Sequence, residues 1–178
     1  MLEYMGNSMH VIDWNSVIKE VQDQEGKCAC KYLPVKEVAE LKEIDDALGN
    51  YCRDSIEWIN YYPDKEFSMD IAHKFGDFVK MPRMIKCWIS KVLPGKTAPW
   101  HWDWDVDWKK YLENGQPIRF TAMINPPAVG HVFIVGDQAL YNEKQGDVHK
   151  WSDFRSYHAG TNCGLVPKFN FNYLAYAE

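Results

Sequence analysis

The spacing of hydrophobic residues along the chain changes near residue 82. Before it, apolar residues recur at three- and four-residue steps between positions 35 and 48, which predicts a helix that begins after Pro34 and stops at Gly49-Asn50. The segments Ser55–Tyr62 and Met69–Phe78 predict two further short helices. We expect these helices to cover one face of a sheet. The apolar residues of the first helix are Val35, Val38, Leu41, Ile44 and Leu48.

After Pro82 the hydrophobic period becomes two, which is typical of strands. Turn signals such as Pro126-Pro127 and Gly136-Asp137 separate the alternating segments. Many short strands that follow helices indicate a mainly β fold, a β-sandwich or jelly roll with helices packed outside. The predicted strands are Met84–Leu93, Ile118–Asn125, His131–Val135, Gly146–Trp151, Ser156–Asn162 and Lys168–Ala177.

Length and composition narrow the class of protein. A chain of 178 residues suits a single domain, 1–178, in which 1–82 is mostly helical support and 83–178 forms the β core. The net charge of −5 argues against a nucleic-acid partner. No apolar run reaches the roughly 18 residues of a membrane span, and the N-terminus lacks a signal-peptide pattern. Five scattered cysteines favour reduced thiols in a cytoplasmic protein. The oligomeric state stays open.

The segment Trp100–Trp108, with the sequence W-H-W-D-W-D-V-D-W, is the most informative for chemistry. If it is extended, its side chains alternate between an aromatic face and a face with one imidazole and three carboxylates. Clustered carboxylates need a positive partner, which a divalent cation would supply. His101 and Asp103 would then reach one ion from the same strand, whereas Asp105 and Asp107 are better explained as solvated or loop-capping residues.

A third ligand has to come from elsewhere in the chain, and His158 is the best candidate. It lies 55 positions after Asp103, near the start of a predicted late strand. Two histidines and one carboxylate form the facial triad of non-haem Fe(II) oxygenases, which leaves open positions for other ligands. The same residue types also hold Zn(II). The metal ligands, and hence the catalytic residues, are therefore predicted to be His101, Asp103 and His158.

With these parts the sequence resembles the 2-oxoglutarate/Fe(II)-dependent dioxygenase superfamily. The resemblance rests on His101-Trp102-Asp103, on Gly146-Asp147, on His158 in H-A-G-T-N, and on Lys168 ten residues later. The layout is similar to prolyl-hydroxylase-like and aspartyl-hydroxylase-like members, and covers about Met84–Ala177. It implies a double-stranded β-helix, a cupin-like jelly roll. It also implies Fe(II), 2-oxoglutarate as co-substrate, O₂ and hydroxylation. Family members act on varied substrates, and the acidic charge and short length of this chain favour a small metabolite, amino acid or peptide side chain.

The resemblance also implies a cation that holds the distal carboxylate of 2-oxoglutarate. Lys168 stands at the expected place, and strand alternation puts it on one face with Asn170 and Asn172. Arg119, on a face with Thr121 and other residues of its strand, is the competitor. Both are candidate co-substrate ligands, with Lys168 preferred.

Two other classes of function remain open on the sequence. One is a cupin-like metalloprotein with a Zn or Mn isomerase or hydrolase activity, for which a cation inside the barrel is needless. The other is a non-catalytic β-sandwich that binds a partner. In that class His101 and His158 would lie far apart.

Overall fold

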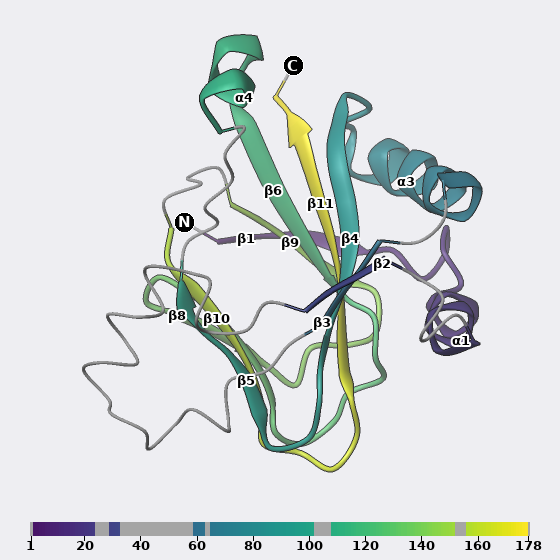
Figure 1. The fold of residues 1–178 in the computed structure, drawn as a ribbon, viewed down its shortest axis with the longest axis vertical. Coiled ribbons are helices and arrows are strands. Elements are labelled where there is room, and N and C mark those ends of the chain that lie inside the picture. Colours follow the sequence, from purple (N-terminus) through teal and green to yellow (C-terminus); the bar gives the residue numbers. More distant parts are fainter. Residues whose placement is uncertain are drawn as a thin grey trace.

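The computed structural model describes residues 2–23, 29–32, 59–62, 65–101, 108–151 and 156–177. Two antiparallel sheets and three helices make up this part of the chain (Figure 1). The helices are α1 (Trp14–Asp23), α3 (Lys65–Val79) and α4 (Trp108–Asn114). The strands are β1 (Glu3–Asn7), β2 (Ala29–Tyr32), β3 (Ile59–Tyr62), β4 (Met84–Val92), β5 (Lys96–His101), β6 (Pro117–Met123), β7 (His131–Val135), β8 (Gln138–Tyr141), β9 (Asp147–Trp151), β10 (His158–Asn162) and β11 (Lys168–Tyr176).

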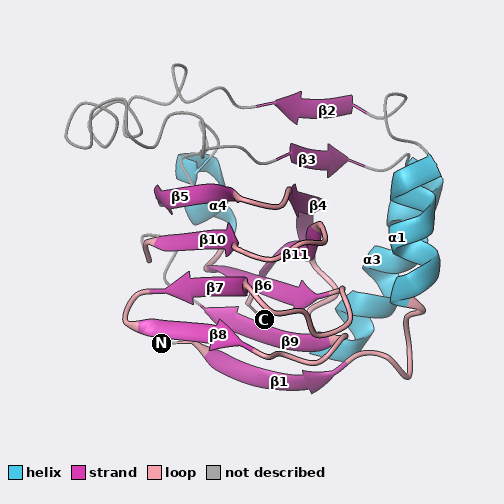
Figure 2. Cartoon of the chain, turned by 90° about the horizontal axis from the view of Figure 1, so that it is seen from below, coloured by secondary structure: helices cyan, strands magenta, loops and turns pink. Residues whose placement is uncertain are grey.

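The strands from β4 to β11 form a double-stranded β-helix. The larger sheet has the order β1-β9-β6-β11-β4-β3-β2, and the smaller has the order β5-β10-β7-β8. Sequential strands mostly pass from one sheet to the other, so that β4, β6, β9 and β11 face β5, β7, β8 and β10. Figure 2 shows the stacked strands seen from below. The predicted jelly-roll fold class is confirmed.

Two helices cover the outer face of the larger sheet, and one of them, α3, contains a helix that was expected there. Figure 1 shows α1 and α3 together on one side of the molecule. Trp14 and Phe75 from these helices are fully buried against Phe171 of β11, with ring centroids 5.3 Å and 5.0 Å from it. Burial of such rings is the largest apolar contribution in a core of this kind. In the described part of the chain no helix is long and apolar enough to cross a bilayer.

Helix α1 was not predicted from the sequence, although its start carries a clear signal. The carboxylate of Asp13 accepts hydrogen bonds from the backbone N–H of Asn15 at 3.1 Å and the hydroxyl of Ser16 at 2.7 Å. This is the geometry of an aspartate N-cap. Val17 and Val21 then follow Trp14 at helical spacing and are buried. The short length of the helix, ten residues, hid this pattern.

The N-terminal half differs in part from the prediction. The helix Met69–Phe78 is confirmed within α3. The helix Ser55–Tyr62 is wrong over its last residues, because Ile59–Tyr62 is strand β3 and pairs with β4. β-branched and aromatic residues in I-N-Y-Y favour that strand. The predicted helix over 35–48 lies outside the described residues, and the single-domain division stays a prediction.

The two sheets enclose a second core inside the barrel. Met123 and Trp151 of the larger sheet pack there with Phe133 and Val135 of the smaller sheet. Strand β11 separates the two cores, since Phe169, Phe171 and Tyr173 belong to the helix-covered core. Lys168, Asn170 and Asn172 alternate with them and are also buried. The predicted division of β11 into an apolar and a polar face is confirmed.

The aromatic cluster around Phe75 predicts a large stability effect. We expect Phe75→Ala to lower the free energy of unfolding by about 3–5 kcal/mol, because the lost ring leaves a cavity between α3 and β11. Urea denaturation followed by circular dichroism measures it. Lys74→Ala, one residue away and exposed, is the control and should change stability by less than about 0.5 kcal/mol. A loss below about 1 kcal/mol for Phe75→Ala would contradict this description of the core.

Candidate functional site

The register of the smaller sheet brings two predicted ligands together. His158, the first residue of β10, is the Cα partner of His101, the last residue of β5. The pairing shifts register between His158 and Gly160, so a bulge lies directly beside the pair. His158 is buried in the barrel, with 3% of its surface exposed. Only the backbone of His101 belongs to the described structure.

The neighbours of this pair mark the outer face of the same sheet. Trp100 and Tyr157 stack with ring centroids 6.2 Å apart and an interplanar angle of 15°. Both rings are exposed. Because successive residues of a strand face opposite sides, an exposed Tyr157 agrees with a His158 ring that enters the barrel. Tyr157 therefore lies on the outer face of the smaller sheet.

Inside the barrel, the ring of His158 is held in one tautomer. Its Nε2 lies 3.2 Å from Nη1 of Arg119, and its Nδ1 lies 3.2 Å from the backbone oxygen of Ser156. A guanidinium only donates hydrogen bonds and a carbonyl oxygen only accepts them. His158 is therefore neutral here, with its proton on Nδ1 and the lone pair of Nε2 facing Arg119. The rings of Phe133 and Trp151 flank it, with centroids 6.1 Å and 5.7 Å away.

Arg119 is enclosed by two tryptophan rings. Its guanidinium carbon lies 4.9 Å from the ring centroid of Trp88 and 5.0 Å from that of Trp151. Its Nη2 donates to Oδ1 of Asn172 at 3.3 Å, and Nδ2 of Asn172 donates to the hydroxyl of Ser90 at 3.0 Å. Stacking on two aromatic faces and a fixed amide hold the planar group in place. The structure thus puts Arg119 beside His158.

Lys168 lies elsewhere in the barrel, at the start of β11. Its ammonium donates to the backbone oxygen of Val132 and lies 5.4 Å from the ring centroid of Phe133. A Cβ added at position 160 would lie 3.5 Å from Nζ, an ordinary van der Waals contact, so Gly160 of β10 lies directly beside the ammonium. Burial lowers the pKa of Lys168 from 10.5 to about 7, because desolvation disfavours the charged form.

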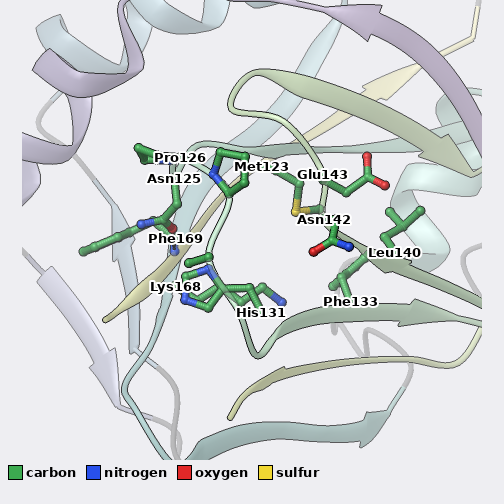
Figure 3. Close-up of a pocket in the computed structure, with 12 residues that line it drawn as sticks. Met123, Asn125, Pro126, His131, Phe133, Leu140, Asn142, Glu143, Lys168 and Phe169 are labelled. Atoms are coloured by element: carbon green, nitrogen blue, oxygen red, sulfur yellow. Dashed lines mark hydrogen bonds between the residues drawn. The ribbon is translucent and has the colours of Figure 1, made fainter. Parts of the chain in front are cut away.

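A small cavity of about 30 Å³ reaches Lys168 (Figure 3), enough for one or two water molecules. Lys168 and His131 lie on one side of it, and Glu143 lies across from them. Burial is also the main reason that the pKa of His131 is lowered. The carboxylate of Glu143 is bound by Nε2 of His149 at 2.7 Å, which gives the buried His149 a structural role. The lining residues are Met123, Asn125, Pro126, Pro127, Ala128, His131, Phe133, Leu140, Asn142, Glu143, Lys168 and Phe169.

Amides and a hydroxyl continue the polar lining between the two cations. Nδ2 of Asn170 lies 3.5 Å from the hydroxyl of Thr121 and 3.0 Å from the sulfur of Met123. These residues come from β6 and β11, which are neighbours in the larger sheet. Polar side chains therefore line the interior between the pair His158 and Arg119 at one end and Lys168 at the other.

The predicted triad lies partly outside the described residues. Among the described side chains, no group of three or more histidine, cysteine, aspartate or glutamate residues is arranged to hold a metal ion. Asp103 lies outside the described residues, as do the rest of 102–107, and the side chain of His101 is not described. The triad His101, Asp103 and His158 stays a prediction.

The sequence did not reveal the two tryptophans around Arg119. Trp88 and Trp151 both lie in predicted strands, and alternation gives their faces. The missing information is that their strands flank β6 and β11 in the larger sheet, since the pairing of distant strands leaves no mark in local periodicity.

No family model matches the sequence, and no curated protein matches it either. Among solved structures, it is similar to a 2OG-Fe(II) oxygenase family oxidoreductase from Burkholderia pseudomallei. The two sequences are 12% identical, the match covers 92% of this chain and 91% of that chain, and the TM-score is 0.49. A ribosomal oxygenase from Escherichia coli has 17% identity and a TM-score of 0.46, over 68% of this chain and only 32% of its own.

A predicted oxalate decarboxylase from Thermotoga maritima has 13% identity and a TM-score of 0.42, over 68% of this chain and 82% of its own. The activities in these descriptions differ from one another. The chemistry of the present chain has to be argued from its own residues.

The buried lysine predicts a pH dependence of stability. The pKa of Lys168 is about 7 when folded and about 10.5 when unfolded, so the unfolded chain binds more protons between these values. We expect the free energy of unfolding to rise with pH from about 7 toward 10, by at most about 1.4 kcal/mol per pH unit. Urea denaturation at pH 7, 8 and 9 measures the slope. In Lys168→Met this part of the slope should vanish, and an unchanged slope would refute the assignment.

Proposed function

We propose that this chain is an Fe(II)- and 2-oxoglutarate-dependent oxygenase of the double-stranded β-helix type. His101, Asp103 and His158 would hold the metal, and Lys168 would hold the far carboxylate of the co-substrate. The observation that carries the proposal is the cross-strand pairing of His101 with His158 in the smaller sheet. A prolyl-hydroxylase-like or aspartyl-hydroxylase-like assignment is the finer form of the same proposal.

The pairing supports a shared metal position. Residues directly opposite in an antiparallel pair have Cβ atoms about 4.5–5.5 Å apart on the same face of the sheet. That separation suits two imidazoles that bind one ion. The non-catalytic alternative requires these two histidines to lie far apart, and the register of β5 and β10 contradicts that requirement.

The chemistry of His158 fits a metal ligand. Metals bind a neutral imidazole through a nitrogen lone pair, and the other ring nitrogen commonly donates to a backbone carbonyl. His158 has this arrangement, with Nδ1 toward the oxygen of Ser156 and the lone pair on Nε2. When bound by two histidines and a carboxylate, Fe(II) supplies positions for a 2-oxo acid and O₂ and so the oxidation itself.

Lys168 fits the role of a carboxylate ligand better than Arg119 does. Its buried ammonium lies at a cavity that Arg119 does not line, and it offers a point charge to one end of a dicarboxylate. Arg119 instead contacts His158, next to the proposed metal position. The cavity holds only one or two water molecules, so it has to widen to admit the five-carbon acid. The aromatic rings of Phe133 and Trp151 then exclude water from His158.

The prime substrate class stays part of the proposal. We propose a small metabolite, an amino acid or a peptide side chain, with no nucleic-acid or membrane partner and a cytoplasmic location. The net charge of −5 supports the view on nucleic acid.

Turnover of the co-substrate tests the proposed function. With Fe(II) and O₂, the protein should convert 2-oxoglutarate to succinate slowly even without its prime substrate, and anaerobic addition of both should give a metal-to-ligand charge-transfer band. His158→Ala should abolish turnover, because one metal ligand is lost. Lys168→Ala should raise the KM for 2-oxoglutarate by about tenfold or more, since one charged hydrogen bond is worth about 1.5–3 kcal/mol.

The matched control is His73→Ala, which removes an exposed histidine of α3 far from the barrel interior. Its turnover should equal that of the wild type. Equal turnover in His158→Ala would remove the metal assignment. Metal binding without the charge-transfer band would favour the cupin-like alternative.

Binding of the dicarboxylate should be coupled to proton uptake. At pH 8 Lys168 is mostly neutral, because its pKa is about 7, and a carboxylate beside it would favour the charged form. We expect up to about one proton to be taken up per 2-oxoglutarate bound to the metal-loaded protein at pH 8. Calorimetric titration in two buffers of different ionisation enthalpy measures it. Lys168→Arg is the control, since arginine stays charged and should bind without this uptake; equal uptake in both proteins would contradict the role of Lys168.

A further inference from the structure

We propose that Arg119 gates the metal position: its guanidinium and the metal ion compete for the same lone pair of His158, and an acid co-substrate relieves the competition. The inference rests on the proposed function, which supplies the metal ion. The competition itself is inferred from the contact between Arg119 and His158. It assigns Arg119 a role that differs from that of the carboxylate ligand Lys168.

The competition follows from the geometry of the imidazole. Nδ1 of His158 is directed at the backbone oxygen of Ser156, which leaves Nε2 as the only lone pair of the ring. Nη1 of Arg119 lies 3.2 Å from that atom. A lone pair that accepts an N–H cannot at the same time bind a metal. Metal binding through Nε2 therefore requires the Arg119–His158 hydrogen bond to break.

The surroundings of Arg119 limit how far it withdraws. Trp88 and Trp151 lie on its two sides, at 4.9 Å and 5.0 Å, and Asn172 binds its other terminal nitrogen. After losing His158, the guanidinium would still lie within a few ångströms of a divalent cation in the barrel. Two positive groups at such a separation repel strongly in a poorly solvated interior. The metal alone should thus bind weakly.

A carboxylate bound to the metal would change this balance. Its negative charge would offset the repulsion between the ion and the guanidinium, and it would accept hydrogen bonds from the displaced Nη1. The acid should therefore tighten metal binding by more than its own chelation provides. By linkage, the metal should tighten binding of the acid by the same factor. The ligand class is a 2-oxo acid or another small dicarboxylate that reaches the metal position.

Titration with Co(II), read from its visible absorption, tests the gate without turnover. We compare wild type, Arg119→Met and Arg83→Met, each with and without 2-oxoglutarate. Arg83 is exposed beside Tyr176, so Arg83→Met is a matched loss of one charge outside the barrel. Arg119→Met should bind Co(II) alone about tenfold tighter than wild type does, and 2-oxoglutarate should tighten its binding about tenfold less. Arg83→Met should behave as wild type.

The sign of the effect separates a gate from a merely structural arginine. Looser or unchanged Co(II) binding in a folded Arg119→Met would overturn the inference, while Co(II) binding that is lost in His158→Ala would still support the proposed function. If the wild type and Arg119→Met both fail to bind Co(II), the proposed function falls, and the inference with it.

A measurement on the wild type keeps the inference testable if Arg119→Met does not fold. Long-range ¹H–¹⁵N spectra of the metal-free protein, assigned with His158→Gln, should show His158 neutral with its proton on Nδ1. Addition of Zn(II) should shift both its Nε2 signal and the guanidinium signals of Arg119. Guanidinium signals that stay in place while Nε2 shifts would overturn the gate.

Discussion

Strand β11 is the constraint on which the rest of the molecule depends. It lies in the middle of the larger sheet, between β6 and β4, and nearly all of its residues are buried. Phe169, Phe171 and Tyr173 hold the helices against one face, whereas Lys168, Asn170 and Asn172 line the barrel on the other. Since the side-chain period of a strand is two, a shift by one residue would bring the polar row into the helix core. Fold and candidate site are thus set by one register.

Burial of two cationic side chains in the barrel interior lowers the stability of the fold, because charged groups lose their hydration there. Lys168 and Arg119 are both almost fully buried, and each is accommodated differently. Lys168 donates to a single carbonyl oxygen beside an aromatic ring, and desolvation lowers its pKa to about 7. Arg119 stays charged at any ordinary pH and is enclosed by two indole rings and an amide. On our proposal, this interior holds a small anionic molecule.

On our proposal, the two cations have separate tasks along the interior. Lys168 lies at the cavity, where one end of an acid would be held. Arg119 lies beside the ring of His158, where the metal would bind. A dicarboxylate that spans from one to the other would meet a positive charge at each end. On our proposal the metal-binding end is therefore coupled to the acid, and neither ligand is expected to bind independently of the other.

The local sequence was enough to predict much of the barrel. The period of two and the turn signals gave strands that match β4, β6, β7, β9, β10 and β11 within a few residues, and alternation alone assigned the polar face of Lys168 and the face of Arg119. The sequence-based prediction missed β3, because a strand of four residues is too short to show a period. It also missed α1, because the N-cap at Asp13 was not recognised.

Only the tertiary structure decided which strands are neighbours. The contacts of the candidate site join residues that are between 31 and 57 positions apart in the sequence. They are the pairing of His101 with His158, the packing of two tryptophans on Arg119, and the contact of Arg119 with His158. Local periodicity reports which face a residue occupies, because that depends on the backbone of its own strand. Which residue lies opposite it depends on long-range strand order, which is set by the summed burial of both cores.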